Sequence, residues 1–216
     1  MKLHQPTIVA VSGFSSNVGK TTLVCKLLEH LPGWEAIKIT RGHYRSCGRD
    51  PQACCVSDLL EDYAVVRSGR DSNYQSGKDT GKFWDAGATN VHWVIVSDDQ
   101  VEQGIAEALS RVKAEGVVIE GNSFLQYIDA DVTIMCSRSE GGKIKNSARE
   151  TLSKTNLLYL STINGQGANA RLEFENWRAS LLIDLHLDQL PLITAEDLPQ
   201  LIESIRNKSH RLQPAL

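Results

Sequence analysis

The sequence lacks any long hydrophobic run. Its most apolar stretches, such as 91–96 and 131–136, have the length of strands and fall far short of the ~20 residues that cross a bilayer. The first residues lead straight into an apolar strand pattern, without the apolar stretch and small-residue cleavage site of a signal peptide. We therefore expect a cytoplasmic protein with no membrane partner.

An excess of basic residues is absent as well. Lys and Arg number 23 against 26 Asp and Glu, for a formal net charge of −3, so no overall positive field attracts the chain to a nucleic acid. The cysteine count of five is odd, which favours reduced thiols or metal ligands over a disulfide framework. Internal repeats and low-complexity tracts are also missing. A chain of 216 residues with 41% hydrophobic side chains is expected to form one globular domain.

Short apolar runs alternate with helical patterns along the chain, which is typical of βαβ units. The predicted strands are 7–12, 35–39, 91–97, 116–120, 131–136 and 157–163. The predicted helices are 20–31, 79–88, 100–114 and 194–207, the last opened by a Thr-x-x-Asp cap. The polar stretch between residues 40 and 78 reads as a functional loop or small insertion. The predicted fold class is therefore α/β, a mostly parallel sheet flanked by helices.

A glycine-rich segment, GFSSNVGKTT at 13–22, lies between the first predicted strand and helix. This is the context that a phosphate-binding P-loop requires. Backbone N–H groups of such a loop face the phosphates, while Lys20 adds a positive charge and the Thr21 hydroxyl binds Mg²⁺. Five residues separate Gly13 from Gly19, where the usual pattern has four. The alternative is a Gly/Ser turn that only caps a helix.

The loop predicts a site for ATP or GTP with Mg²⁺ in a P-loop nucleoside triphosphatase (NTPase) fold. Its expected nucleotide-binding residues are Gly13, Ser15, Ser16, Asn17, Val18, Gly19, Lys20, Thr21 and Thr22.

Three further residues follow or end predicted strands, at the edge where open α/β folds bind ligands. Glu120 is the candidate for Mg²⁺ or its water shell, against the alternative of a salt-bridged or capping Glu. Lys38 supplies a second positive charge to a triphosphate or an anionic substrate, or else is a surface lysine. Asn164 opens a Gly-x-Gly loop and is a candidate base-recognising residue, although Asn before Gly is usually a turn residue.

Four stretches give the chain a family resemblance. The lengthened loop spacing resembles dethiobiotin synthetase, and the rest resembles the MobB family, nucleotide-binding accessory proteins of molybdopterin-guanine dinucleotide biosynthesis. The matching stretches after the P-loop are Ala36 to Thr40, Gly77-Lys78-Asp79-Thr80 with Ala86-Gly87-Ala88, and Val117-Val118-Ile119-Glu120-Gly121. They cover roughly the first 120 residues.

The resemblance implies GTP as the nucleotide, a homodimer, a role in molybdenum-cofactor assembly and a place for Asp79 near the phosphates. Asp79 is alternatively only the first acid of its helix. Lys20, Glu120 and Asp79 are thus the candidate catalytic residues, with Thr21 and Glu120 as the candidate Mg²⁺ ligands.

A cysteine- and arginine-rich segment departs from the family, whose members have only a short loop here. It contains His43, Cys47, Cys54 and Cys55, candidate ligands for Zn²⁺ or an iron–sulfur cluster, or else reduced thiols packed as small hydrophobic residues. The same segment holds Arg41, Arg45 and Arg49, which either clamp an anionic substrate or are solvated. We treat residues 40–76 as an insertion in a single P-loop domain.

Three functions are therefore open. The first is a slow Mg²⁺-dependent NTPase that serves molybdenum-cofactor or related metal-cofactor assembly, with molybdopterin or an assembly protein as partner. The second is a metal-carrying chaperone with a nucleotide switch. The third is an ATP-dependent ligase or kinase that resembles dethiobiotin synthetase and takes an acidic substrate.

Overall fold

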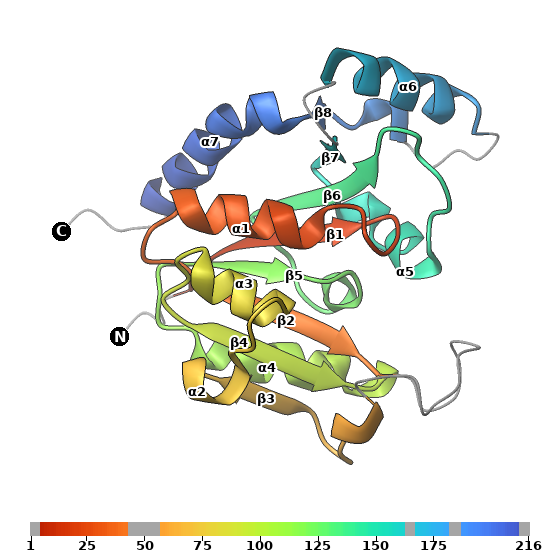
Figure 1. Ribbon diagram of the computed structural model, residues 1–216. Coiled ribbons are helices and arrows are strands. Elements are labelled where there is room, and N and C mark those ends of the chain that lie inside the picture. The colour runs from red at the N-terminus through yellow and green to blue at the C-terminus, as the bar shows by residue number, and fades with distance from the viewer. Residues whose placement is uncertain (1–4, 43–56, 163–166, 182–186, 212–216) are drawn as a thin grey trace.

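The structure, a computed structural model, describes residues 5–42, 57–162, 167–181 and 187–211 (Figure 1). Its strands form one sheet in the order β3-β4-β2-β5-β1-β6-β7-β8. The pairing is parallel throughout except between β3 and β4. The strands are β1 (Thr7–Gly13), β2 (Glu35–Arg41), β3 (Val65–Ser68), β4 (Val91–Val96), β5 (Gly116–Glu120), β6 (Val132–Arg138), β7 (Leu157–Ser161) and β8 (Leu192–Ile193).

Helices cover both faces of this sheet, so the predicted α/β class is confirmed. The α-helices are α1 (Lys20–His30), α2 (Arg70–Asn73), α3 (Asp79–Asp85), α4 (Val101–Arg111), α5 (Asn146–Arg149), α6 (Gly167–Ala179) and α7 (Leu198–Arg211). Short 3-10 helices lie at η2 (Ser57–Leu59), η3 (Asp98–Gln100), η4 (Ser123–Gln126), η5 (Leu152–Lys154), η6 (Leu187–Gln189) and η7 (Ala195–Asp197). Within the described residues, no helix combines the length and apolar character needed to cross a membrane.

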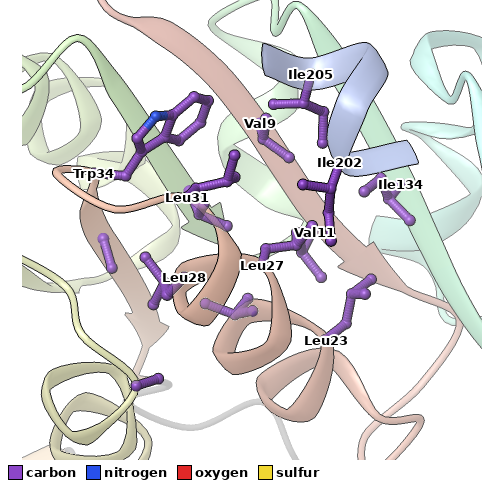
Figure 2. Close-up of a cluster of buried hydrophobic side chains, with 14 of the residues drawn as sticks. Val9, Val11, Leu23, Leu27, Leu28, Leu31, Trp34, Ile134, Ile202 and Ile205 are labelled. Atoms are coloured by element: carbon purple, nitrogen blue, oxygen red, sulfur yellow. The ribbon is translucent and has the colours of Figure 1, made fainter. Parts of the chain in front are cut away.

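Alternate residues of the central strands pack against helices on opposite faces of the sheet. On one face, Val9 and Val11 of β1 lie in a cluster with Leu27 of α1, Ile134 of β6 and Ile202 of α7 (Figure 2). α3 adds its buried phenylalanine to this cluster. The two-residue period of β1 thus explains why its two neighbouring helices, distant in sequence, share one core.

The other face of the sheet is covered by α4, α5 and α6. Ala10 of β1 and Ile119 of β5 pack in a cluster with Ile105 of α4. A neighbouring cluster joins Met135 of β6 to Phe174 of α6. Because helices bury both faces, β1 and β5 contain the continuous apolar runs 8–11 and 117–119 rather than alternating patterns, as expected for parallel sheets.

Several elements differ from the sequence-based expectation. The region expected to be a loop between residues 40 and 78 carries the antiparallel edge strand β3 and the short helix α2. α6 and β8 were also not predicted, because the apolar residues of α6 do not form a clear helical stripe and β8 has only two residues. The predicted capping box of Thr194 and Asp197 is present, but it opens the 3-10 turn η7 ahead of α7.

A buried polar chain joins three strands at the amino-terminal end of β2. His92 of β4 is fully buried, and its Nε2 lies 2.7 Å from Oε2 of Glu35. The other ring nitrogen of His92 lies 2.8 Å from the Ser68 hydroxyl of β3. The second carboxylate oxygen of Glu35 accepts hydrogen bonds from the backbone N–H groups of Lys113 and Ala114, each at 2.9 Å. Every polar atom of the pair has a partner, as burial demands.

We expect Glu35→Ala to lower the free energy of unfolding by about 3 kcal/mol, because it leaves a buried imidazole and two backbone N–H groups without their acceptor. Urea denaturation followed by circular dichroism measures the loss. Glu115→Ala is the matched control, since Glu115 is exposed and its replacement should cost less than about 0.5 kcal/mol. Equal losses of unfolding free energy in the two variants would show that the buried contacts of Glu35 add no stability.

Candidate functional site

The P-loop connects β1 to α1 and contains two residues in the left-handed backbone region. Asn17 has a φ of 59° and Gly19 a φ of 85°. A Cβ on Gly19 would lie 2.5 Å from Cβ of Ser161, and a Cβ on Gly13 would lie 2.7 Å from Cγ2 of Val18. Both glycines are therefore required for close approach of the loop to its neighbours. Asn17 is the residue type other than glycine that best tolerates this conformation.

Residues that follow the two strands beside β1 hold the loop from both sides. Asn122, just after β5, accepts from the backbone N–H of Gly13 at 3.0 Å and donates to its carbonyl at 2.9 Å. Arg138, at the end of β6, donates twice to the carbonyl of Asn17, at 3.0 and 3.1 Å. The backbone N–H of Lys145 donates to the carbonyl of Phe14 at 2.9 Å. The additional residue in the loop is thus accommodated by a left-handed turn at Asn17 that Arg138 anchors.

The N-terminus of α1, next to the loop, has no side-chain cap. Gly19 caps α1 without a side-chain hydrogen bond, and no acidic residue lies in the first turn. The ammonium group of Lys20 donates to the carbonyl of Ser15 at 2.9 Å. Burial lowers the pKa of Lys20 below its ordinary value, against the opposing charge of Glu120. A partly desolvated lysine that contacts only a neutral oxygen gains from an anion placed at the loop.

An ion cluster lies beside Lys20 at the carboxyl end of β5. Nζ of Lys38 lies 2.6 Å from Oε1 of Glu120 and 2.6 Å from Oδ2 of Asp79. The hydroxyl of Thr21 donates to the other oxygen of Glu120 at 3.0 Å. Burial lowers the pKa of Lys38, but the two carboxylates raise it more, so the pKa lies above its ordinary value. Lys38 therefore stays charged and holds Glu120 in a fixed position.

Asp79 begins α3 and is the more exposed of the two carboxylates. Burial raises its pKa, whereas the charge of Lys38 and the hydrogen bond from Lys38 lower it, and the net pKa is below the ordinary value. Asp79 is thus ionised at neutral pH and is a weak proton acceptor.

Two cavities flank the P-loop. The smaller, about 160 Å³, is lined by Ser15, Lys20, Lys38, Glu120 and Lys145 among others. The larger, about 360 Å³, lies on the side of β6, β7 and α6 and is lined by Gly19, Thr22, Arg138, Tyr159 and Asn169 among others. The P-loop therefore has an ion-rich cavity at the carboxyl edge of β2 and β5, and a wider one toward α6.

The structure places Lys20, Thr21, Lys38, Asp79 and Glu120 close together at one edge of the sheet. The alternative readings of Glu120 as a salt-bridged residue and Asp79 as the first acid of a helix also describe their contacts. The predicted residues that lie outside the described part of the chain are Asn164, His43, Arg45, Cys47, Arg49, Cys54 and Cys55. Within the described residues, no group of three or more His, Cys, Asp or Glu side chains is arranged to hold a metal ion.

The residues that the sequence analysis missed are Asn122, Arg138 and Lys145. Asn122 and Arg138 each come two residues after the end of a predicted strand, so the rule that identifies Glu120 would have found them only if it had been extended by two residues beyond every strand. Lys145 has no such signal, because it lies several residues beyond β6 and reaches the loop through the tertiary fold.

No protein-family model and no curated protein matches this sequence. Among solved structures, it is similar to the Signal Recognition Particle 54 kDa protein from Aeropyrum pernix K1 in complex with GDP, with 13% identity and a TM-score of 0.48. That match covers 96% of this chain and 50% of the other, so the chain spans half the length of that protein.

Two further solved structures are similar over nearly their whole length. A plasmid partition protein from Borrelia burgdorferi B31 bound to AMPPNP has 13% identity and a TM-score of 0.40, with 94% of this chain and 99% of that chain covered. A Cyanothece McdA variant in complex with ATP has 12% identity and a TM-score of 0.40, with coverage of 99% and 100%. At such identities and TM-scores we carry no residue role over from these proteins. The chain's own strand, P-loop and helix give it a P-loop NTPase-like fold.

We expect Asp79→Asn to be less stable than the wild type at pH 7. A carboxyl whose folded-state pKa is lowered stabilises the fold above its unfolded pKa of about 3.9, and this contribution disappears as the pH falls through the lower folded value. The difference between wild type and Asp79→Asn should therefore shrink below about pH 4. Urea melts between pH 3 and 7 measure it, with the exposed Asp62→Asn as control. A difference independent of pH would contradict this electrostatic account.

Proposed function

We propose that this protein binds a nucleoside triphosphate with Mg²⁺ at the P-loop and hydrolyses it slowly. The observation that carries the proposal is that Lys20, Thr21 and Glu120 lie on one side of the P-loop, where the N-terminus of α1 has no side-chain cap. Phosphates would lie along the loop amides, with Lys20 moving from the Ser15 carbonyl to the phosphate chain.

The donor set fits Mg²⁺. The Thr21 hydroxyl and one Glu120 oxygen are within hydrogen-bond distance of each other, and both are hard oxygen donors of the kind that Mg²⁺ binds directly or through water. When bound, the ion supplies charge neutralisation to the phosphate oxygens. Thr21 and Glu120 would hold it, and Lys38 would keep Glu120 oriented through its 2.6 Å ion pair.

Slow hydrolysis follows from the side chains available to activate water. Asp79 has a lowered pKa and pairs with Lys38, so it accepts a proton poorly. Glu120 is nearly fully buried and is committed to Lys38 and Thr21. Positioning and charge neutralisation by these residues would supply the rate enhancement, and a partner that completes the site would raise it.

The nucleoside would enter the wider cavity. Gly19 and Thr22 of the P-loop helix line it, so a phosphate chain on the loop leads into it. Asn169 of α6 lines the same cavity and provides an exposed amide for a base, whereas Tyr159 of β7 is buried and forms part of the cavity wall. Asn164 stays a candidate for base recognition from the sequence alone.

The cellular role that we propose is in molybdenum-cofactor or related metal-cofactor assembly, as a homodimer that uses GTP or ATP. Its support is the resemblance of the four sequence stretches to the MobB family. The metal-carrying chaperone rests on His43, Cys47, Cys54 and Cys55 in the sequence, and metal analysis of the purified protein tests it.

We expect MgATP or MgGTP to raise the melting temperature of the wild type and to leave Lys20→Ala unchanged, because a ligand that binds only the folded state stabilises it by mass action. Calorimetric titration with each nucleotide gives the dissociation constants. Lys154→Ala is the control, since Lys154 pairs with Asp129 away from the loop, and it should bind as the wild type does. If the wild type binds neither nucleotide, or Lys20→Ala binds both equally well, the proposal is wrong.

A second candidate is transfer of the terminal phosphoryl group to an acidic acceptor. The smaller cavity favours it, because Arg41 lines it beside Lys20, on the magnesium side of the loop, and the ion pair of Arg41 with Asp98 is partly exposed. Nucleotide turnover should then rise at least about tenfold when the correct carboxylic acid is added from a panel of small mono- and dicarboxylates. Turnover that no acid stimulates would leave the simple NTPase as the function.

A further inference from the structure

Lys145 reaches the P-loop from the segment between β6 and α5. Its backbone N–H holds the carbonyl of Phe14 at 2.9 Å, and its ammonium group donates to the hydroxyl of Ser16 at 2.9 Å. The side chain also lines the smaller cavity, together with Lys20 and Glu120. A second lysine therefore meets the phosphate-binding loop from a different part of the chain than α1.

The ammonium group of Lys145 forms no ion pair within the described part of the chain. Among the residues that the structure describes, no carboxylate lies within ion-pair distance of its ammonium group, whereas Lys38 contacts two. The partner of Lys145 is a neutral, exposed hydroxyl. Exchanging such a partner for a charged phosphate oxygen adds an attraction between opposite charges that the hydroxyl does not supply.

The net charge around the smaller cavity depends on Lys20 and Lys145. The positive charge of Lys38 is more than offset by Asp79 and Glu120, so this cluster adds no net positive charge to the cavity. Lys20 and Lys145 are close enough that their repulsion helps to lower the pKa of Lys20, after the larger effect of burial. An anion between the two ammonium groups would relieve that repulsion.

The position of Lys145 selects one end of the phosphate chain. The cavity that it lines contains the carboxylate of Glu120, at the magnesium side of the loop, while the wider cavity near Gly19 and Thr22 is suited to the nucleoside. We propose that Lys145 binds the terminal phosphate of the nucleoside triphosphate, its ammonium group leaving the Ser16 hydroxyl for a phosphate oxygen. This inference rests on the proposed function.

The test compares triphosphate with diphosphate. Calorimetric titrations of MgATP, MgADP, MgGTP and MgGDP are run on the wild type, Lys145→Ala, Lys145→Arg and Lys143→Ala. Lys143 is the matched control, because it is an exposed lysine two residues earlier in the same segment. Lys145 is itself exposed, so melting temperatures without nucleotide should be equal in all four proteins.

We expect Lys145→Ala to weaken triphosphate binding about tenfold and diphosphate binding less than about twofold, as the loss of one charge-assisted contact predicts. Lys145→Arg should retain most of the affinity, and Lys143→Ala all of it. The triphosphate effect should also decrease at high salt, because it is electrostatic.

Two results would overturn the inference alone. Equal losses for triphosphate and diphosphate would show that Lys145 acts only through the shape of the loop at Ser16. Triphosphate binding by Lys145→Ala as tight as that of the wild type would show that it makes no phosphate contact. A wild type that binds no nucleotide would overturn the proposed function and this inference together.

Discussion

The carboxyl edge of the sheet depends on the ion pair between Lys38 and Glu120. The two residues are register partners in the neighbouring parallel strands β2 and β5, and Glu120 is only 2% exposed. An unpaired carboxylate at that depth would cost several kcal/mol. Because Lys38 takes one oxygen of Glu120, the other is directed to the hydroxyl of Thr21. The pair thereby ties the strand edge to the first turn of α1, and through it to the P-loop.

The strand order explains why the P-loop is held so completely. β1 lies between β5 and β6. Asn122, which follows β5, and Arg138, which ends β6, can therefore both reach the loop backbone. In this loop with one additional residue, Arg138 holds the carbonyl of Asn17, whose backbone lies in the left-handed region. Contacts from both sides also separate the space at the loop into two cavities of different chemistry.

Much of this arrangement is predictable from sequence because it depends on local patterns. The apolar runs give the central strands to within two residues, and the rule that polar residues after strands meet at one edge places Glu120 and Lys38. β3 has only four residues and lies in a polar segment, so its pairing with β4 depends on contacts far along the chain. The contact of Lys145 with the loop could not be predicted for the same reason, because only the path of the chain after β6 brings Lys145 to Ser16.

The charged groups discussed above differ in the kind of partner to which each is bonded. Glu35 has the His92 imidazole and backbone N–H groups as partners, and Lys38 has two carboxylates, so they gain little from a ligand. Among the residues that the structure describes, the ammonium group of Lys20 donates to a carbonyl and that of Lys145 to a hydroxyl. A hydrogen bond to a neutral oxygen is weaker than one to an anion, so these two lysines retain the interaction energy that a phosphate can use. Charge alone does not distinguish a structural residue from a binding one, whereas the identity of its partner does.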